Sequence, residues 1–193
     1  MEQDKYKRDF IGFVERLCPL GNDAATIFSQ QLVTVRFNKG ETILKQDGIC
    51  RYVYFINSGL VKTWFESKDR SFIMRFFAEG NMFTVLDSYL AQQPSAYAVE
   101  ALENTVLTRI SKTDMDKLCA RFHTAETFFR KLISMASVNM MSRIGEILEE
   151  QASVRYENFL GENPDLVQRI SLGDMASYLG ITQVSLSRIR AII

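Results

Sequence analysis

The chain has 193 residues, a length that suits one or two modest domains, and 47% of them are hydrophobic, which is ample for a packed core. Lys and Arg together number 23, as do Asp and Glu, so no overall charge indicates a nucleic acid, a membrane surface or an acidic substrate as partner. The charged amino terminus, and the lack of a run of roughly 18 apolar residues, predict a cytoplasmic protein with no membrane partner.

Cysteine and histidine usage argues against several kinds of site. Cys18, Cys50 and Cys119 are odd in number and widely spaced, which favours reduced thiols over a disulfide framework. His123 is the only histidine, whereas a metal-dependent barrel enzyme needs two or three of them, and no Gly-rich phosphate loop or nucleophile elbow is found. The sequence therefore predicts a protein that is not an enzyme and has no metal or other cofactor.

The first part of the chain has the pattern of a helix followed by many strands. Apolar residues from Tyr6 to Leu17 recur at helical spacing, which predicts an amphipathic helix packed on the domain that follows. From Leu32 to about Ile110, short β-branched and aromatic runs alternate with turn residues, which is typical of an antiparallel barrel or sandwich. Seven runs are candidate strands: LVTVRF, ETILK, YVYFI, LVKTWFE, FIMRFF, YAVEAL and TVLTRI. Asn57 to Gly59 is expected to form a tight hairpin between two of them.

After residue 110 the pattern becomes helical. Ser111 and Thr113 are candidate caps for a helix over KTDMDKLCARF, and one long helix is expected from Ala125 to about Gln151. At 1.5 Å per residue that helix would span roughly 40 Å, more than a small barrel needs. It carries two apolar stripes, which predict that one stripe packs on the barrel and the other pairs with the same helix of a second subunit; the alternative is a single deeply buried helix. The first stripe is Phe129, Ile133, Ala136, Met140, Ile144 and Ile147, and the second is Phe128, Leu132, Met135, Met141 and Leu148.

The end of the chain, ISLGDMASYLGITQVSLSRIR, predicts a helix-turn-helix. One helix is expected from Leu172 to about Leu179 and a second from Gln183 to the end, with Gly180 in a left-handed turn between them. Ala176 is expected at the point of closest approach, and the hydroxyl of Thr182 is expected to cap the second helix. The segment from Gly161 to Gln168 is the expected junction with the long helix.

The outer face of the second helix carries side chains that suit the major groove of DNA. The expected exposed set is Gln183, Val184, Ser187, Arg188 and Ala191. Arg188 suits guanine, Gln183 suits adenine or a phosphate, and Val184 suits a thymine methyl group. From Arg121 onward eight basic residues balance eight acidic ones, so phosphate contacts must come from a few placed residues such as Arg169, Arg188 and Arg190. A pair of helices that only packs, and touches no DNA, is the alternative.

This layout resembles the cyclic-AMP receptor protein and FNR family of bacterial transcription regulators, and the resemblance covers nearly the whole chain. It implies an α+β fold with an amino-terminal cyclic-nucleotide-binding-like jelly roll over residues 1–121, a dimerisation helix over 122–151 and a DNA-binding helix-turn-helix over 152–193. It also implies a homodimer that binds a palindromic operator in double-stranded DNA. The DNA-binding residues carried over are Thr182, Gln183, Val184, Ser185, Ser187, Arg188 and Arg190. Many relatives continue into a β-hairpin wing, which has no evident counterpart before Ile193.

The chain departs from the family where cyclic nucleotides bind. Phe83 and Thr84 stand where nucleotide-binding members have Gly-Glu, and Pro94 stands where they have the Arg that pairs with the cyclic phosphate, followed by matching Ser95 and Ala96. Burial of a cyclic phosphate without that Arg forfeits a charge-assisted pair. We therefore expect a small-molecule effector other than a cyclic nucleotide, or none, in a pocket near these five residues. The alternative function is a dimeric ligand-binding or protein-interaction module that lacks sequence-specific DNA binding.

Two further features of the strand region remain open at this point. Lys62 and Arg75 suit an anionic ligand if they face inward, whereas basic residues on a barrel are more often solvated. The aromatic residues Trp64, Phe65, Phe72, Phe76, Phe77 and Phe83 suit either an apolar pocket or ordinary core packing.

Overall fold

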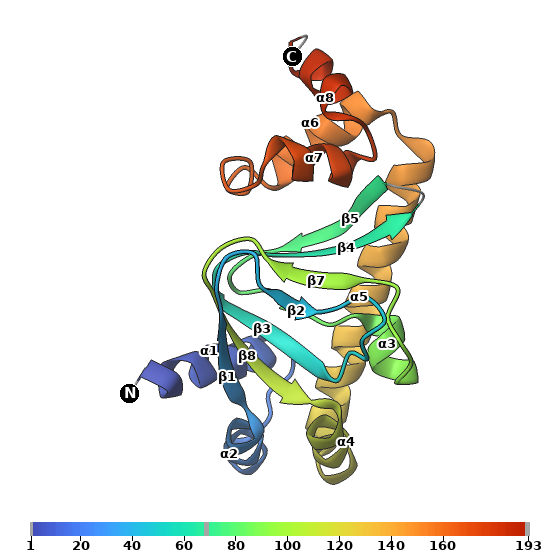
Figure 1. Cartoon of the computed structure of the whole chain (residues 1–193). Helices are drawn as coiled ribbons and strands as arrows, with labels where there is room; N and C mark the ends of the chain where they lie inside the picture. The colour runs from blue at the N-terminus through green and yellow to red at the C-terminus, as the bar shows by residue number, and fades with distance from the viewer. Residues whose placement is uncertain (1, 68–69, 192–193) are drawn as a thin grey trace.

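The computed structural model describes residues 2–67 and 70–191, and it has the expected α+β architecture of two packed antiparallel sheets, a long helix and a carboxyl-terminal helical unit (Figure 1). The first sheet has the strand order β1 (Val33–Phe37), β8 (Thr105–Ser111), β3 (Tyr52–Ser58) and β6 (Met82–Phe83). The second has the order β2 (Thr42–Leu44), β7 (Ala98–Ala101), β4 (Val61–Ser67) and β5 (Arg70–Phe77).

The seven candidate strands are confirmed, and an eighth strand is present that the sequence did not indicate. This is β6, whose two residues pair with Tyr54 and Phe55 of β3. Two residues are too few to show the alternation that identifies a strand. The strand is recognisable only by its partner in the sheet.

The predicted hairpin at Asn57 to Gly59 is wrong. It joins β3 to β4, and these strands lie in different sheets, so the turn is a corner between layers. Gly59 has φ 98°, and a Cβ there would lie 2.4 Å from Oγ1 and 2.8 Å from Cα of Thr105. Only glycine fits this close approach of two chain segments. Corner and hairpin share the same turn residues, so local sequence does not distinguish them.

Helices close the sheets at one side. Helix α1 (Glu2–Leu17) begins earlier than predicted and buries Phe10 and Val14. Helix α4 (Lys112–Arg121) begins as predicted, with Ser111 Oγ accepting a hydrogen bond from the backbone N–H of Asp114 at 3.0 Å. Helices α2 (Asn22–Gln31) and α3 (Leu86–Ala91) were not predicted; α3 has only six residues, too few for a clear helical period. Cys18, Cys50 and Cys119 are free thiols, as expected.

The long helix is confirmed as α5 (His123–Glu149), which runs alongside the sheets and ends beside the carboxyl-terminal unit (Figure 1). Its burial does not follow the two stripes. Phe128 and Leu132 of the second stripe are buried, but Met141 and Leu148 of the same stripe are 69% and 78% exposed. The helix is therefore divided along its length: the amino half packs on the barrel, and the carboxyl half leaves apolar residues of both stripes exposed.

Beyond α5 the chain forms a second, smaller hydrophobic cluster. Helix α6 (Ala152–Glu162) was not predicted from the sequence. It contributes Tyr156 and Phe159 to this cluster. Helices α7 (Leu172–Leu179) and α8 (Gln183–Arg190) contribute most of the remainder. Leu60 of the barrel belongs to the same cluster, so the terminal unit packs directly on the barrel. Within the part of the chain that the structure describes, no helix is both long and apolar enough to cross a bilayer.

Candidate nucleic-acid interface

Helices α7 and α8 are joined by a short turn whose ends are held by local side chains. Ser171 Oγ accepts a hydrogen bond from the backbone N–H of Asp174 at the start of α7, and Thr182 Oγ1 accepts one from Ser185 at the start of α8. Gly180 ends α7 with φ 68°, the left-handed conformation that favours glycine. The predicted bounds of α7, the predicted start of α8 and the Thr182 cap are confirmed; residues 192–193, where we expected α8 to continue, lie outside the described residues.

The two helices pack through the residues that the sequence placed between them. Ala176 is 2% exposed, and the backbone N–H of Ile181 donates to its carbonyl oxygen at 3.0 Å. Met175, Leu179 and Leu186 are buried in the same cluster. This packing fixes the angle between α7 and α8, and it leaves the opposite face of α8 free.

That free face carries the residues expected to contact DNA. Thr182, Gln183, Val184, Ser187, Arg188 and Arg190 are exposed, and Ser185 is half-buried. Helix α8 lies on the far side of α7 from the sheets, so the face is directed away from the barrel (Figure 1). Val184 is 63% exposed, so its methyl groups are accessible to a partner on this face.

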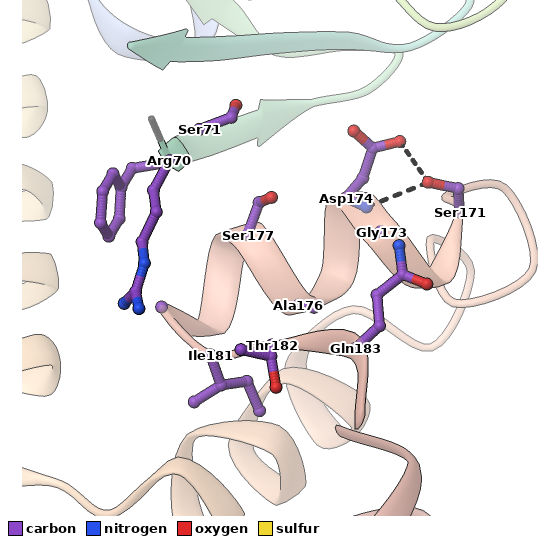
Figure 2. Close-up of a pocket in the computed structure, with 12 residues that line it drawn as sticks. Arg70, Ser71, Ser171, Gly173, Asp174, Ala176, Ser177, Ile181, Thr182 and Gln183 are labelled. Atoms are coloured by element: carbon purple, nitrogen blue, oxygen red, sulfur yellow. Dashed lines mark hydrogen bonds between the residues drawn. The ribbon is translucent and has the colours of Figure 1, made fainter. Parts of the chain in front are cut away.

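Three residues of this face, Thr182, Gln183 and Ser185, already contact other parts of the protein. The Gln183 side chain lies against the amino end of α7, where a Cβ on Gly173 would be only 2.9 Å from its Nε2 (Figure 2). The hydroxyls of Thr182 and Ser185 lie 3.0 Å apart within the cap. Arg188 and Arg190 make no ion pair among the described residues, so their guanidinium groups are free for a nucleic acid.

The terminal unit is held against the barrel by ion pairs at the base of α7. Lys62 Nζ of β4 lies 2.9 Å from Asp174 Oδ1 and 3.7 Å from Glu100 Oε2. Arg169 bonds to Glu79 and to Glu103 through four contacts of 2.7–3.0 Å. The interpretation of Arg169 as a phosphate contact is therefore wrong for this arrangement, because its donors are used within the protein.

A cleft of about 450 Å³ separates the start of β5 from α7 beside these ion pairs (Figure 2). Its barrel side is Arg70, Ser71 and Phe72, and its other side includes the turn from Gly180 to Thr182. Figure 2 shows Asp174 and Ser171 bonded to each other at one end of this cleft.

Two arginines that the sequence did not single out position the end of α7. Arg143 of α5 is 3% exposed, donates from Nη2 to the carbonyl oxygen of Tyr178 and lies 3.7 Å from the centre of that ring. Arg155 of α6 donates from Nη2 to the carbonyl oxygen of Leu179 at 2.7 Å. Both satisfy carbonyls that the helix end leaves unpaired, with charge of the favourable sign. Their targets lie 24 or more positions along the chain, so no local pattern reveals them.

The five residues aligned with the cyclic-nucleotide site are not gathered around one space. Phe83 and Thr84 line a cavity between the barrel and α5, but Pro94, Ser95 and Ala96 do not. Ser95 is 1% exposed, and its hydroxyl bonds to both backbone groups of Tyr97. Its polar atoms are thus engaged by the chain itself. Among the described residues no group of three or more His, Cys, Asp or Glu side chains is arranged to hold a metal ion.

Comparisons with known proteins agree with this architecture. Residues 34–122 match the family model of the cyclic nucleotide-binding domain. The transcriptional regulatory protein btr of Bordetella pertussis is 25% identical over 166 residues, which cover 80% of this chain and 68% of that protein.

Two solved structures share the fold over most of the chain. FixK2 from Bradyrhizobium japonicum superposes with a TM-score of 0.70 at 23% identity, covering 83% of each chain. A Crp/Fnr-family protein from Eubacterium rectale superposes with a TM-score of 0.72 at 19% identity, covering 90% of this chain and 83% of the other. Residues 34–122 are thus similar to the cyclic nucleotide-binding domain, and most of the chain has the fold of these two proteins.

Proposed function

We propose that this protein is a cytoplasmic transcription regulator that binds a palindromic operator as a homodimer, with α8 in the major groove. The observation that carries the proposal is the exposed face of α8, on which Arg188 and Val184 stand free above a helix-turn-helix that is capped and packed. In this geometry the second helix reads base edges through its amino-terminal residues. The division into residues 1–121, 122–151 and 152–193 is part of the same proposal.

The carboxyl half of α5 supports the homodimer. Four large apolar residues of this half are exposed and lie outside the cavity between the barrel and α5: Val138, Met141, Ile147 and Leu148. A contiguous apolar surface of this kind on one helix is unfavourable in water and marks a protein contact. Pairing with the same helix of a second copy would bury it and would set two α8 helices roughly 34 Å apart, the spacing of successive major grooves.

Selection of random duplexes by the purified protein tests the proposal. We expect a palindrome with half-sites about ten base pairs apart. Arg188→Ala should weaken binding to it by about 5- to 150-fold and relax the preference at one position, because a bidentate contact to guanine contributes about 1–3 kcal/mol. Arg190→Ala, which removes a phosphate contact, should weaken binding to all DNA sequences alike. It should also lower the slope of log affinity against log salt concentration by about one.

The control is Arg130→Ala. It removes an exposed arginine from the amino half of α5, away from α8, and should leave DNA binding unchanged. Sedimentation should give a dimer at micromolar concentration. A confirmed dimer that selects no sequence at low salt would favour the alternative, a dimeric ligand-binding or protein-interaction module. A monomer would contradict the proposal outright.

A further inference from the structure

A cavity of about 810 Å³ lies where the barrel, α5 and the terminal helical unit meet, and the DNA-binding role proposed above does not account for it. Its volume lies within the range of about 300–1,000 Å³ that is common for small-molecule sites. Seven aromatic rings are among its walls: Phe13, Phe76, Phe77, Phe83, Tyr97, Phe159 and Tyr178. Of the aromatic residues that the sequence singled out, Phe76, Phe77 and Phe83 thus face a space, whereas Phe65 stacks on Phe72 elsewhere, 5.4 Å between ring centres.

Arg75 introduces a positive charge into this apolar wall. It lies opposite Thr63 in the β4–β5 ladder, and directly opposed residues project to the same face of a sheet. Thr63 is 8% exposed and also lines the cavity, so Arg75 is on the inner face. Lys62, its neighbour in the ladder, projects the other way and pairs with Asp174. Of the two basic strand residues, only Arg75 is therefore placed for an internal ligand.

The other charged residues of the lining are either paired within the protein or exposed to solvent, whereas Arg75 has no partner among the described residues. Arg143 is bound to Glu146 at 3.0 Å and to a backbone carbonyl. Asp87 and Glu162 are exposed, so water solvates them at the open side. Arg75 is half-buried and makes no hydrogen bond or ion pair with any described residue. A guanidinium without a partner on this wall is available to pair with an anionic group of a ligand.

We propose that this cavity binds a small ligand with a flat, apolar body and one anionic group, held by Arg75 through a charge-assisted contact. The aromatic rings accept the apolar body by stacking, and the forked guanidinium suits a carboxylate, sulfonate or phosphate. Thr84 and Pro94 stand where nucleotide-binding relatives have the Glu for the ribose and the Arg for the cyclic phosphate, so this ligand is not a cyclic nucleotide. This inference deepens the proposed function, since it names the chemistry of the effector of the same regulator.

The position of the cavity also explains how such a ligand would reach the DNA-binding unit. Phe159, Leu166 and Tyr178 of the wall belong to the terminal unit, and Tyr178 lies in the last turn of α7. An occupant would therefore touch the helix that precedes α8. It would shift the population of terminal-unit orientations by its differential affinity for them.

A matched pair of fluorescent probes tests the ligand class on the full chain without DNA. The anionic probe is 1-anilinonaphthalene-8-sulfonate, and the neutral one is N-phenyl-1-naphthylamine, which has the same rings and no sulfonate. We expect Arg75→Gln to weaken the anionic probe about tenfold, as loss of one charge-assisted contact implies, and to leave the neutral probe within about twofold. Arg75→Lys should restore part of the affinity. Met74→Trp, which fills the cavity from the same strand, should weaken both probes.

Arg70→Gln is the control, because Arg70 lies on the same strand but lines the separate cleft beside α7. Equal binding of the anionic probe by wild type and Arg75→Gln would overturn the proposal, as would failure of both probes to bind folded wild type. Displacement of the anionic probe by cyclic AMP would overturn the ligand class. If the wild-type chain binds the anionic probe as expected but selects no DNA sequence, the proposed function is contradicted. The inference about the ligand is then unaffected.

Discussion

The contact between Arg169 and two carboxylates gives a direct test of how the terminal unit is attached. Arg169 lies just before α7, and its guanidinium bonds to Glu79, which follows β5, and to Glu103, which precedes β8. We expect Arg169→Gln to remove these bonds and to leave two carboxylates facing one another without a cation. The terminal unit should then separate from the barrel more easily, and the whole chain should unfold at lower urea.

The size of the stability loss in Arg169→Gln follows from the solvent exposure of the three side chains. Hydrogen bonds to charged groups contribute about 1.5–3 kcal/mol when buried, whereas exposed ion pairs contribute about 0.2–1 kcal/mol. The Arg169, Glu103 and Glu79 side chains are 25%, 33% and 43% exposed, which excludes the upper values. We expect a loss of about 1–2 kcal/mol in the free energy of unfolding, or roughly 2–8 °C in Tm for a chain of this length.

The stability loss in Arg169→Gln should become smaller as the pH falls. Burial raises the pKa of Glu79, but hydrogen bonds from Arg169 and from the backbone N–H of Gly59 outweigh it, so the pKa lies below its ordinary value of 4.5. A carboxyl whose pKa is lowered by folding stabilises the protein above its unfolded pKa, and the contribution is lost as the pH falls through the folded pKa. The difference in stability between wild type and Arg169→Gln should therefore be full at pH 6–7 and shrink below about pH 4.5.

Urea titration followed by circular dichroism, with Arg130→Gln as the matched control, measures these values. Replacing Glu79 and Glu103 by Gln in the Arg169→Gln background should recover part of the stability, because it removes the carboxylates left unpaired. A change below about 0.5 kcal/mol at pH 7 would mean that solvent screens the contact and that apolar packing alone attaches the unit. A difference that grows at acid pH would refute the assigned role of Glu79.

Three further predictions follow from backbone and packing geometry. Gly59→Ala should cost at least about 2 kcal/mol in urea titration, because the new Cβ would overlap Thr105 at a positive φ; an unchanged midpoint would show that the corner relaxes. Ser171→Ala should cost about 1 kcal/mol by loss of the α7 cap, and Ser171→Asp should restore it; equal midpoints for all three proteins would contradict this. Leu132→Ala should lower stability by about 2–4 kcal/mol at any protein concentration, whereas Met141→Ala should weaken only the association measured by sedimentation; the reverse pattern would contradict the division of α5 along its length.

Local chemistry determined the elements at the end of the chain. The bounds of α7 and the start of α8 follow from Ser171, Gly180 and Thr182, and each acts through a hydrogen bond or a backbone conformation within a few residues of itself. The seven longer strands follow for the same reason, since alternation along a strand reports which side chains face the core. The exposed face of α8 then follows from helical geometry alone, and so most candidate DNA contacts could be named from the sequence.

Whatever depends on residues distant in the chain was decided only by the tertiary structure. The sheet to which each strand belongs, and hence the role of Gly59 as a corner, depends on pairing partners that a turn does not specify. The two stripes of α5 are periodic along the whole helix, but the barrel ends partway along it, and that boundary determines which residues are buried. Arg169 and Arg75 look alike in sequence. One is bound to carboxylates from two distant loops and the other faces an apolar cavity, because the partners of a charged side chain are set by the fold around it.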